Sequence, residues 1–515
     1  MKLGICSGKS KEIEKDEFYR QVSAQLEGLD YTELYSAYSG SIRKSQVEPR
    51  ILFELPVCAY ALGVYSTRKI EELCRNHVQF LLRLDGQEPP DHTTIARFRS
   101  GKITGKAIAG LFEQYNKQLE KMGETEHDAV FIDGTKLESK ANKYTFVWRK
   151  TVERELKKIK EKLKKLVPES DGYTTNKKTL EYIDKLDQEI AEAHIEVKRG
   201  RGHHKPALVR LRDEVKALSE RRQAYEEKKR ILGEGRNSYS KTDPDATFMH
   251  MKEDHMRNGQ LKPGYNVQFA VNSEYIVGIG VFPNRTDYAA LPTLLDSMFA
   301  AHGKRYSKVV TDSGYESLSN YRYPDVHEQQ AYIKPNNYES SKTRKYISQI
   351  GRAENMAYYE PEDYYLCKAG RILACIGTTN ETAKDGTKRE LSIYRCEDCV
   401  GCPHRAACCK AKDAEKPKEV VICRELARFR QNSLERIITN EGKLLRVNRS
   451  IQAEGSFGQL KHNRGFKRFL MGGNVKVMTE LCLLSLSQNI VKYIGKCNNG
   501  KCKTHLLHPK ALLKF

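Results

Sequence analysis

The chain of 515 residues is long enough for two to four domains and at least one sizeable hydrophobic core. Its 89 Lys and Arg residues exceed its 67 Asp and Glu residues by 22, which favours a polyanionic partner, with nucleic acid ahead of an anionic membrane surface. No apolar run reaches the roughly 18–20 residues that cross a bilayer, and the first residues lack the apolar core of a signal peptide, so we expect an intracellular protein with no membrane partner.

Residues 1–125 are predicted to form an all-helical domain. Residues 51–62 have the apolar composition of a buried helix. Asp91 is placed to cap a helix start that exposes Arg97 and Arg99. Basic residues at a helix start fit contact with DNA, and the alternative is an ordinary helical domain without that role.

An α/β core is predicted in two parts, residues 126–148 and 237–335, because apolar strand patterns there are followed by a helix and further strands. One short apolar strand is predicted to end at Asp133 and another at Asp312. A buried strand that delivers an Asp at its carboxyl end is a common way to place a catalytic carboxylate. Each Asp taken alone could instead be a helix cap or a turn residue.

Residues 149–236 are predicted to be a charged helical insert in this core. Apolar residues at steps of four and three, first from Val152 to Leu166 and then in two later segments, are typical of coiled-coil seams. Breaks are expected at residues 168–175 and 200–206. We expect a helical hairpin or small bundle that mediates dimerisation or contacts DNA.

Residues 336–427 are predicted to be a Cys-rich insert. Two CxxC steps and a further Cys place four thiol groups in a short segment, which is enough for a tetrahedral zinc ion. The four residues are Cys396, Cys399, Cys402 and Cys408. Cys367, Cys375 or Cys423 could replace one of them, and an iron–sulfur cluster or metal-free thiols are the alternatives. A zinc ion here would brace the insert and take no part in catalysis.

Residues 428–515 are predicted to hold a third carboxylate and a basic surface. Residues 441–515 contain 14 Lys and Arg residues but only three acidic residues. Glu454 is expected on a helix, with Lys461 about two turns later on the same face. We expect four cations to clamp DNA phosphates, namely Lys461, Arg464, Lys467 and Arg468. A solvated, salt-bridged helix is the alternative.

Asp133, Asp312 and Glu454 are together the predicted catalytic carboxylates. If the two strands are neighbours in one sheet, their Asp residues meet at one edge, and a helix packed there adds Glu454. Carboxylate oxygens without His or Cys suit Mg²⁺ or Mn²⁺, and two such ions activate a water or a 3′-hydroxyl in phosphoryl transfer. Asp243 and Asp245 compete for the first position, although their sequence context is that of a turn.

Several motifs of the chain resemble those of bacterial insertion-sequence transposases of the DDE class, in the same order and over nearly the whole chain. They are Asp133-Gly134-Thr135-Lys136, Ser240-Lys241-Thr242-Asp243-Pro244-Asp245-Ala246, Pro263-Gly264-Tyr265-Asn266-Val267-Gln268, Thr311-Asp312-Ser313-Gly314-Tyr315, and Glu454 with Lys461.

This resemblance implies an α/β fold in which an RNase H-like core is interrupted by the coiled-coil insert and the Cys-rich insert and is preceded by an all-α DNA-binding domain. It implies a transposase that cleaves double-stranded DNA at the terminal inverted repeats of an insertion sequence and joins the ends to target DNA. Asp133, Asp312 and Glu454 would hold two Mg²⁺ or Mn²⁺ ions. Because transposition holds two DNA ends together, we expect a homodimer, located in the cytoplasm and associated with the bacterial nucleoid.

The chain departs from the family pattern just before Glu454. Many relatives place an Arg four residues before the Glu and a Tyr three residues before that Arg, where this chain has Ser450 and Val447. Arg446 and Arg449 lie nearby and could substitute. Two other functions stay open: a metal-dependent nuclease without strand transfer, and a catalytically silent DNA-binding or regulatory protein with the same fold.

Overall fold

The structure is a computed structural model that describes residues 9–38, 46–103, 105–167, 176–195, 204–251, 259–383, 386–409, 411, 413 and 416–508. The chain divides into two compact units. Unit 1 comprises residues 1–136, 266–282 and 286–515, and unit 2 comprises residues 137–265 and 283–285. The predicted break at residues 168–175, and the first part of the break at 200–206, lie outside the described residues.

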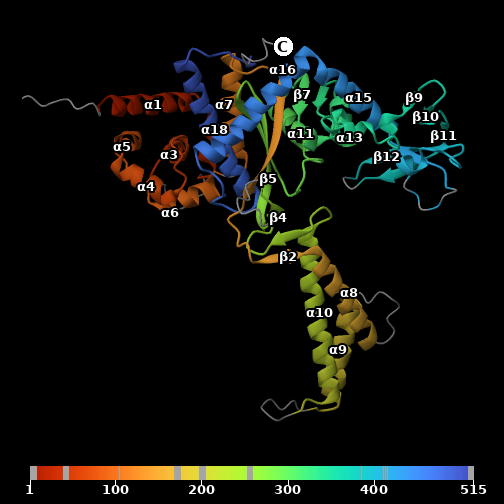
Figure 1. Ribbon diagram of the computed structural model, residues 1–515. Helices are drawn as coiled ribbons and strands as arrows, with labels where there is room; N and C mark the ends of the chain where they lie inside the picture. The colour runs from red at the N-terminus through yellow and green to blue at the C-terminus, as the bar shows by residue number, and fades with distance from the viewer. Residues whose placement is uncertain are drawn as a thin grey trace, which may run out of the picture. The chain divides into compact units, whose positions relative to one another are not determined.

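The N-terminal part of unit 1 is helical (Figure 1). Its elements are α1 (Lys9–Glu27), α2 (Thr32–Ser36), α3 (Pro49–Ala61), α4 (Thr67–Asn76), α5 (Val78–Leu84), α6 (His92–Arg97), the π-helical turn η1 (Phe98–Lys102) and α7 (Lys106–Lys121). All side chains from residue 51 to residue 60 are buried, which confirms the buried-helix pattern. Asp91 caps α6 as predicted, because its Oδ1 accepts a hydrogen bond from the Thr94 backbone N–H at 2.6 Å.

The main sheet has the strand order β4-β5-β1-β7-β8, where β4 is Thr247–His250, and β6 also pairs with β5. The strands are β1 (Ala129–Glu138), β5 (Leu261–Asn272), β6 (Tyr275–Phe282), β7 (Lys308–Thr311) and β8 (Gln330–Ile333). β5 and β6 form an antiparallel hairpin, whereas β1, β7 and β8 run parallel. The pairing of β1 with β7 reaches Phe131 and Val310, so Asp133 and Asp312 each lie two residues beyond that pair.

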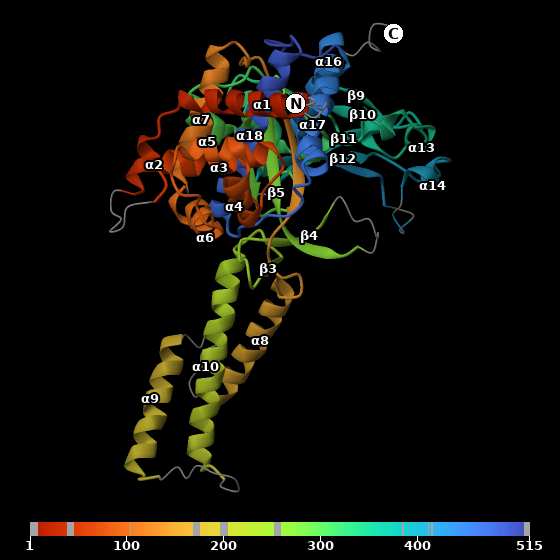
Figure 2. The same ribbon diagram turned by 90° about the vertical axis from the view of Figure 1, so that its left-hand side faces the viewer.

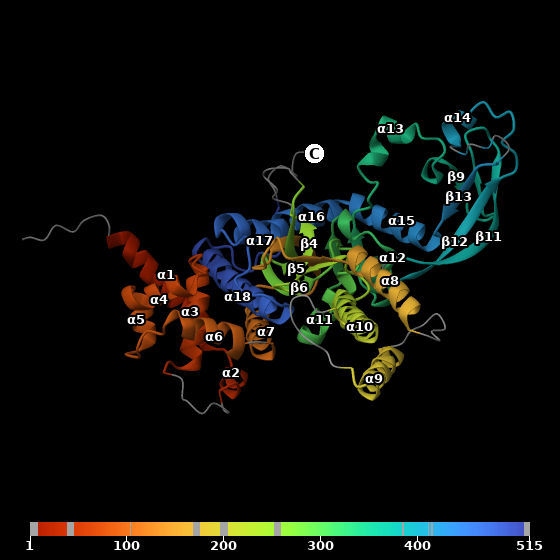
Figure 3. The same ribbon diagram turned by 90° about the horizontal axis from the view of Figure 1, so that it is seen from below.

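Helices pack on both faces of this sheet (Figures 1 and 3). On one face, Val130 and Ile132 of β1 join a hydrophobic core that extends to Phe429. On the opposite face, the ring of Phe457 stacks on Phe269 with 4.5 Å between centroids. The elements concerned are α11 (Leu291–His302), η2 (Ser313–Tyr315), α12 (Leu318–Val326), α15 (Arg424–Ile438), α16 (Asn440–Arg449), η5 (Ser450–Glu454), α17 (Gly455–Gly458), η6 (Gln459–Asn463) and α18 (Asn474–Asn498).

Helix α18 joins the N-terminal helices to the sheet, since it contacts α3, α7 and β6. Asn489, on this helix, binds the outer strand β6 as a neighbouring strand would. Its Nδ2 donates to the Ile276 carbonyl at 2.8 Å, and its Oδ1 accepts from the Ile276 N–H at 2.8 Å. The same Nδ2 donates to Oδ1 of Asn116 on α7 at 3.1 Å.

The Cys-rich segment of unit 1 contains a second, antiparallel sheet with the order β13-β12-β11-β10-β9, which the sequence did not predict (Figure 3). Its buried core is small and consists of Leu373, Tyr394, Cys396 and Val420. The elements are η3 (Ser340–Lys342), α13 (Arg344–Ile347), η4 (Ala353–Asn355), β9 (Ala357–Tyr359), β10 (Tyr364–Leu366), β11 (Ile372–Thr382), β12 (Lys388–Cys396), α14 (Arg405–Cys408) and β13 (Glu419–Ile422).

Unit 2 contains the predicted helical insert (Figure 2). Its elements are β2 (Phe146–Trp148), α8 (Arg149–Leu166), α9 (Asn176–Glu192), α10 (Ala207–Leu232), β3 (Ser238–Ser240) and β4 (Thr247–His250). The predicted apolar seams pack against one another, with Leu163, Ile183 and Val215 buried in one cluster. Within the described residues, no helix of either unit is both long and apolar enough to span a bilayer.

Candidate functional site

A single guanidinium group links two of the three predicted carboxylates. Arg449 Nη1 lies 3.4 Å from Oδ1 of Asp133, and Arg449 Nη2 lies 2.6 Å from Oε1 of Glu454. Asp133 is buried, with 7% of its surface exposed, whereas the Glu454 side chain is 52% exposed. The guanidinium therefore compensates a buried negative charge and holds an exposed glutamate beside it.

The third carboxylate, Asp312, directly follows β7. Its Oδ1 accepts a hydrogen bond from the Gly314 N–H at 2.9 Å and so caps the 3₁₀ turn η2. The strand register puts Asp312 at the same level as Asp133 on the neighbouring parallel strand. The predicted end of the first strand at Asp133 is wrong, because β1 continues to Glu138 with Thr135 and Leu137 buried.

The helix that carries Glu454 is locally widened. Residues Ser450–Glu454 form a π-helical turn, in which residues five apart lie one turn apart, as residues four apart do in an α-helix. Arg449 and Glu454 are separated by five positions and are paired across this turn. Arg449, five residues before Glu454, thus contacts it across a single turn.

The donor chemistry of the three carboxylates suits a hard divalent cation. In the part of the chain that the structure describes, however, no group of three or more His, Cys, Asp or Glu side chains is arranged to hold a metal ion. Arg449 already pairs with Asp133 and Glu454. The residue types fit such an ion, whereas binding one would require this pairing to change.

A buried tyrosine reports the concentration of negative charge at this site. Burial raises the pKa of Tyr315 well above its usual value, and the charges of Asp287, Asp133 and Asp312 raise it further, while Arg449 opposes them. Asp287 was missed in the sequence because it stands between β6 and α11, where it has the appearance of a helix cap. A Thr-Asp pair shortly before a helix was the only signal that it gave.

The predicted phosphate contacts do not form one surface. Lys461 is only 6% exposed, and its Nζ donates to the Lys136 carbonyl at 3.2 Å, so it fastens its helix to β1. Arg464 is partly buried against Gly63 and Tyr65, and burial lowers the pKa of its guanidinium. The remaining two, Lys467 and Arg468, are exposed.

The predicted exposure of Arg99 is wrong, because this residue is 5% exposed. Its Nη1 donates to the Tyr60 hydroxyl at 2.6 Å and to the Tyr65 carbonyl at 2.9 Å, which ties η1 to α3 and the following loop. Arg97 is exposed, as predicted.

A groove of about 570 Å³ adjoins Asp312. Three cationic side chains that the sequence did not single out for DNA binding line it beside Arg449: Lys334, Lys443 and Arg446. The guanidinium of Arg446 also lies 4.9 Å from the ring centroid of Tyr338. The groove therefore combines positive charge with direct access to the strand end that carries Asp312.

The four cysteines predicted to bind zinc line one small cavity of about 20 Å³. Three further candidates line it with them, namely Cys367, Cys409 and His404. Burial and the neighbouring Cys399 thiol raise the pKa of Cys396 to about 12. Of the three predicted substitutes, Cys367 joins this cluster, whereas Cys375 accepts a hydrogen bond from Arg424 at 3.3 Å outside it.

Asp243, the main competitor for the first carboxylate, is occupied within unit 2. It is buried and accepts hydrogen bonds from the Tyr265 hydroxyl at 2.8 Å and from Ser139 Oγ at 2.5 Å. It forms an isolated bridge with Ser240 at the turn that the sequence predicted. Asp243 therefore stabilises a turn.

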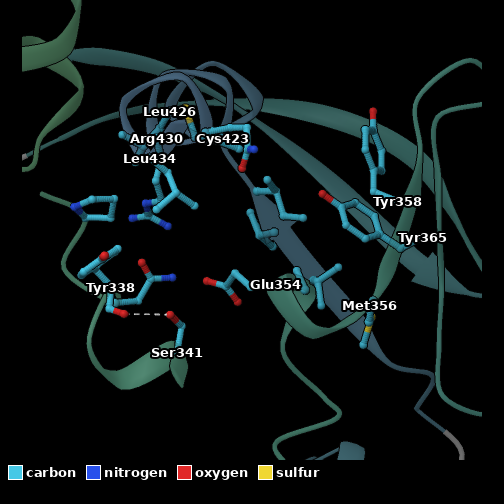
Figure 4. A pocket seen from close by; sticks show the side chains of 18 residues that line it. Tyr338, Ser341, Glu354, Met356, Tyr358, Tyr365, Cys423, Leu426, Arg430 and Leu434 are labelled. Carbon is cyan, nitrogen blue, oxygen red and sulfur yellow. Dashed lines mark hydrogen bonds between the residues drawn. The ribbon is translucent and has the colours of Figure 1, made fainter. Parts of the chain in front are cut away.

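A larger pocket, of about 650 Å³, lies between α15 and the second sheet (Figure 4). Apolar side chains such as Met356 and Leu426 line it together with Glu354 and Arg430. Nε of Arg430 donates to Oε1 of Glu316 at 2.6 Å. None of the three predicted carboxylates lines this pocket, so it is separate from the candidate site.

Comparison with protein families matches two parts of the chain. Residues 366–494 match the family described as transposase DDE domain, and this segment includes Glu454 but neither Asp133 nor Asp312. Residues 9–101 match the family described as transposase domain (DUF772). No curated protein matches the chain. Both matches are to transposase families, in the order expected from the motifs of the chain, and they support an insertion-sequence DDE transposase.

Proposed function

We propose that this transposase cleaves DNA strands at the ends of an insertion sequence and transfers them to target DNA, with Asp133, Asp312 and Glu454 as the catalytic carboxylates. The observation that carries the proposal is the equal offset of Asp133 and Asp312 from the last pair of two parallel strands. The ion pairs that connect Arg449 with Asp133 and Glu454 support the inclusion of the third residue.

The sheet of unit 1 is proposed to be the RNase H-like core. In support, a hairpin of two strands flanks β1 on one side and two parallel strands flank it on the other. The three carboxylates would hold Mg²⁺ or Mn²⁺, and two such ions would polarise the scissile phosphate and lower the pKa of the attacking hydroxyl. The chain's own contribution is to keep Asp133 buried and level with Asp312.

Arg449 is proposed to take the place of the arginine that relatives carry four residues before the glutamate. The π-helical turn supports this assignment, because it inserts one residue and still brings positions 449 and 454 into contact. Arg446, the other candidate, lies over Tyr338 instead.

Double-stranded DNA is proposed to contact the groove beside Asp312 and the exposed cations Lys467, Arg468 and Arg97. Positive charge beside the catalytic carboxylates attracts the phosphate backbone, which supplies most sequence-independent affinity. The burial of Arg99 and Lys461 argues for structural roles for these two residues. A homodimer would hold the two DNA ends, and light scattering of the DNA-bound protein measures its mass.

The cysteine cluster is proposed to bind a structural zinc ion through four of its sulfur or imidazole groups. The supporting observation is that six cysteines and one histidine surround a single cavity. A bound zinc ion would need deprotonated thiols, which it obtains by releasing their protons.

Substitution of the first carboxylate tests the catalytic proposal. Asp133→Asn keeps the shape of the side chain but removes its charge, so Mg²⁺-dependent cleavage of a duplex carrying the element's own terminal repeat should fall by about a hundredfold or more. Strand nicking measured on a sequencing gel gives the rate. Asp296→Asn is the matched control, because Asp296 is an exposed aspartate of α11 and its loss should leave cleavage unchanged.

The same experiment separates the alternatives. Cleavage that persists in Asp133→Asn would overturn the assignment. A pre-cut end that the wild-type protein fails to join to target DNA would point to a nuclease without strand transfer. Binding without any cleavage or joining would point to a regulatory DNA-binding protein.

A further inference from the structure

A fourth carboxylate, that of Asp287, lies beside the candidate site and is fixed by two amide side chains. Its Oδ1 accepts hydrogen bonds from Asn266 Nδ2 at 2.8 Å and from Gln268 Nε2 at 2.7 Å. Both amides are buried on β5, with 2% and 0% of their surface exposed. Helix α11 begins at Leu291 and has Ala290 at its N-cap, so the Asp287 side chain does not serve as a helix cap.

This carboxylate approaches the backbone within two residues of each proposed catalytic Asp. A Cβ atom added to Gly134 would lie 2.8 Å from Asp287 Oδ1 and 2.3 Å from Gln268 Nε2, and one added to Gly314 would lie 3.6 Å from Asp287 Oδ2. Glycine at position 134 is therefore required by the close approach of Asp287 and Gln268. Gly134 follows Asp133, and Gly314 is two residues after Asp312.

A second link runs through the tyrosine beneath the site. The Tyr315 hydroxyl donates to Gln268 Oε1, and the same Gln268 donates to Asp287 through its Nε2. Tyr315 belongs to the turn that Asp312 caps. Asp287, Gln268 and Tyr315 thus form a continuous chain of hydrogen bonds between β5 and the turn that carries Asp312, in which Gln268 and Tyr315 are buried and Asp287 is half-buried.

We propose that Asp287 is a positioning residue of the transposase site, which sets the spacing of Asp133 and Asp312 by bracing Gly134 on one strand and, through Gln268 and Tyr315, the turn after the other strand. The proposal rests on the assignment of Asp133 and Asp312 as catalytic carboxylates. Loss of its charge frees two buried amide donors and loosens the backbone beside both carboxylates.

Direct binding of Mn²⁺ to the full-length protein tests this role without relying on activity. Asp287→Asn should weaken Mn²⁺ binding about 10- to 100-fold, as measured by titration calorimetry or by the electron paramagnetic resonance signal of free Mn²⁺, because residues that orient ligands typically contribute that much. The thermal unfolding temperature, recorded in the same buffer, shows whether the variant is folded. Asp296→Asn is the charge-matched control and should bind as the wild type does.

Gly134→Ala provides a second variant that leaves every charge in place. The added methyl group collides with Gln268 and Asp287, so this variant should weaken Mn²⁺ binding as Asp287→Asn does. Gly110→Ala is its control, because a Cβ at position 110 meets no atom within 4 Å. If Asp287→Asn binds Mn²⁺ as tightly as wild type, the positioning role is refuted, whatever the result for Gly134→Ala.

Asp133→Asn, measured in parallel, separates this inference from the proposed function. Weakened binding in Asp133→Asn together with unchanged binding in Asp287→Asn would overturn the positioning role alone. Unchanged binding in Asp133→Asn would overturn the catalytic assignment, whatever Asp287→Asn does. Weakened binding in both, with both controls unchanged, supports both proposals.

Discussion

Arg449 controls the charge balance of the candidate site. It supplies the cation that faces buried Asp133, and its planar guanidinium reaches Glu454 with a second nitrogen. A lysine ammonium is a single point charge and cannot bridge two carboxylates in this way. Removal of the arginine would take a cation away from a buried carboxylate, which disfavours the charged form of that carboxylate.

Substitution of Arg449 tests this argument. Arg449→Ala should lower strand cleavage about 10- to 100-fold, and Arg449→Lys should recover only part of the loss. In the double variant Arg449→Ser with Ser450→Arg, the arginine occupies the family position, from which the Ser450 hydroxyl already reaches Glu454 Oε1 at 3.3 Å. This variant keeps a cation beside Glu454 but removes the Arg449 guanidinium from Asp133. Its single-turnover cleavage rate should therefore stay below that of the wild type, and restoration to the wild-type rate would contradict the role of the Arg449–Asp133 pair.

The sequence pointed to Asp133 and Asp312 because an apolar run followed by Asp and Gly or Ser is a local pattern, and the condition for their meeting, two neighbouring strands, is met by the pairing of β1 with β7. The burial of Lys461 and Arg99 was beyond a local pattern, since their partners are a carbonyl 325 residues away and a tyrosine 39 residues away. Asp287 escaped notice for the same reason, because its amide partners on β5 make it distinctive only in three dimensions.

In the Cys-rich segment, whole strands could not be predicted from the sequence. Its strands β11 and β12 are mostly exposed or half-buried, so they lack the clear alternation that predicts a strand from sequence. The buried core of this sheet contains only four residues. A core of this size stabilises a fold poorly, and small folds of this kind commonly depend on a metal ion or disulfide bonds.

Zinc in this segment is therefore expected to matter for stability. The purified protein should contain about one zinc ion per chain, and its removal by a chelator should lower the temperature at which the β9–β13 sheet unfolds. Plasma mass spectrometry and thermal scanning with and without the chelator measure both effects. Cys399→Ser should lose the zinc, whereas Cys482→Ser, at a buried thiol of α18, should retain it. If the purified wild-type protein contains no zinc and the chelator does not change its unfolding temperature, the result would favour metal-free thiols.

Across the whole molecule, only Lys and Arg residues with exposed side chains can contact DNA phosphates. Four cations were predicted around Glu454, but burial withdraws Lys461 from the solvent and partly withdraws Arg464. The sequence shows the net charge and the concentration of cations near the C-terminus. It could not assign them to the surface, because burial depends on packing between distant segments.

The salt dependence of DNA binding distinguishes the two classes of cation. Each phosphate contact contributes about 0.9 to the slope of log K against log salt, so Lys467→Ala should reduce that slope by about one. Lys461→Gln keeps a donor for the Lys136 carbonyl and should leave the slope unchanged. Fluorescence anisotropy of a labelled duplex over a series of salt concentrations measures the slope. An equal decrease in both variants would contradict the proposed structural role of Lys461.

The hydrogen bonds between the Asn489 side chain and the Ile276 backbone can form only late in the synthesis of the protein. A ribosome synthesises β6 213 residues before the side chain that pairs with its outer edge. At about 5–20 residues per second, that interval lasts roughly 10 to 40 seconds. During this time the backbone groups of Ile276 are open to pairing with any other extended chain, including a second nascent copy. Chaperone demand should therefore be greatest late in translation, just before α18 emerges.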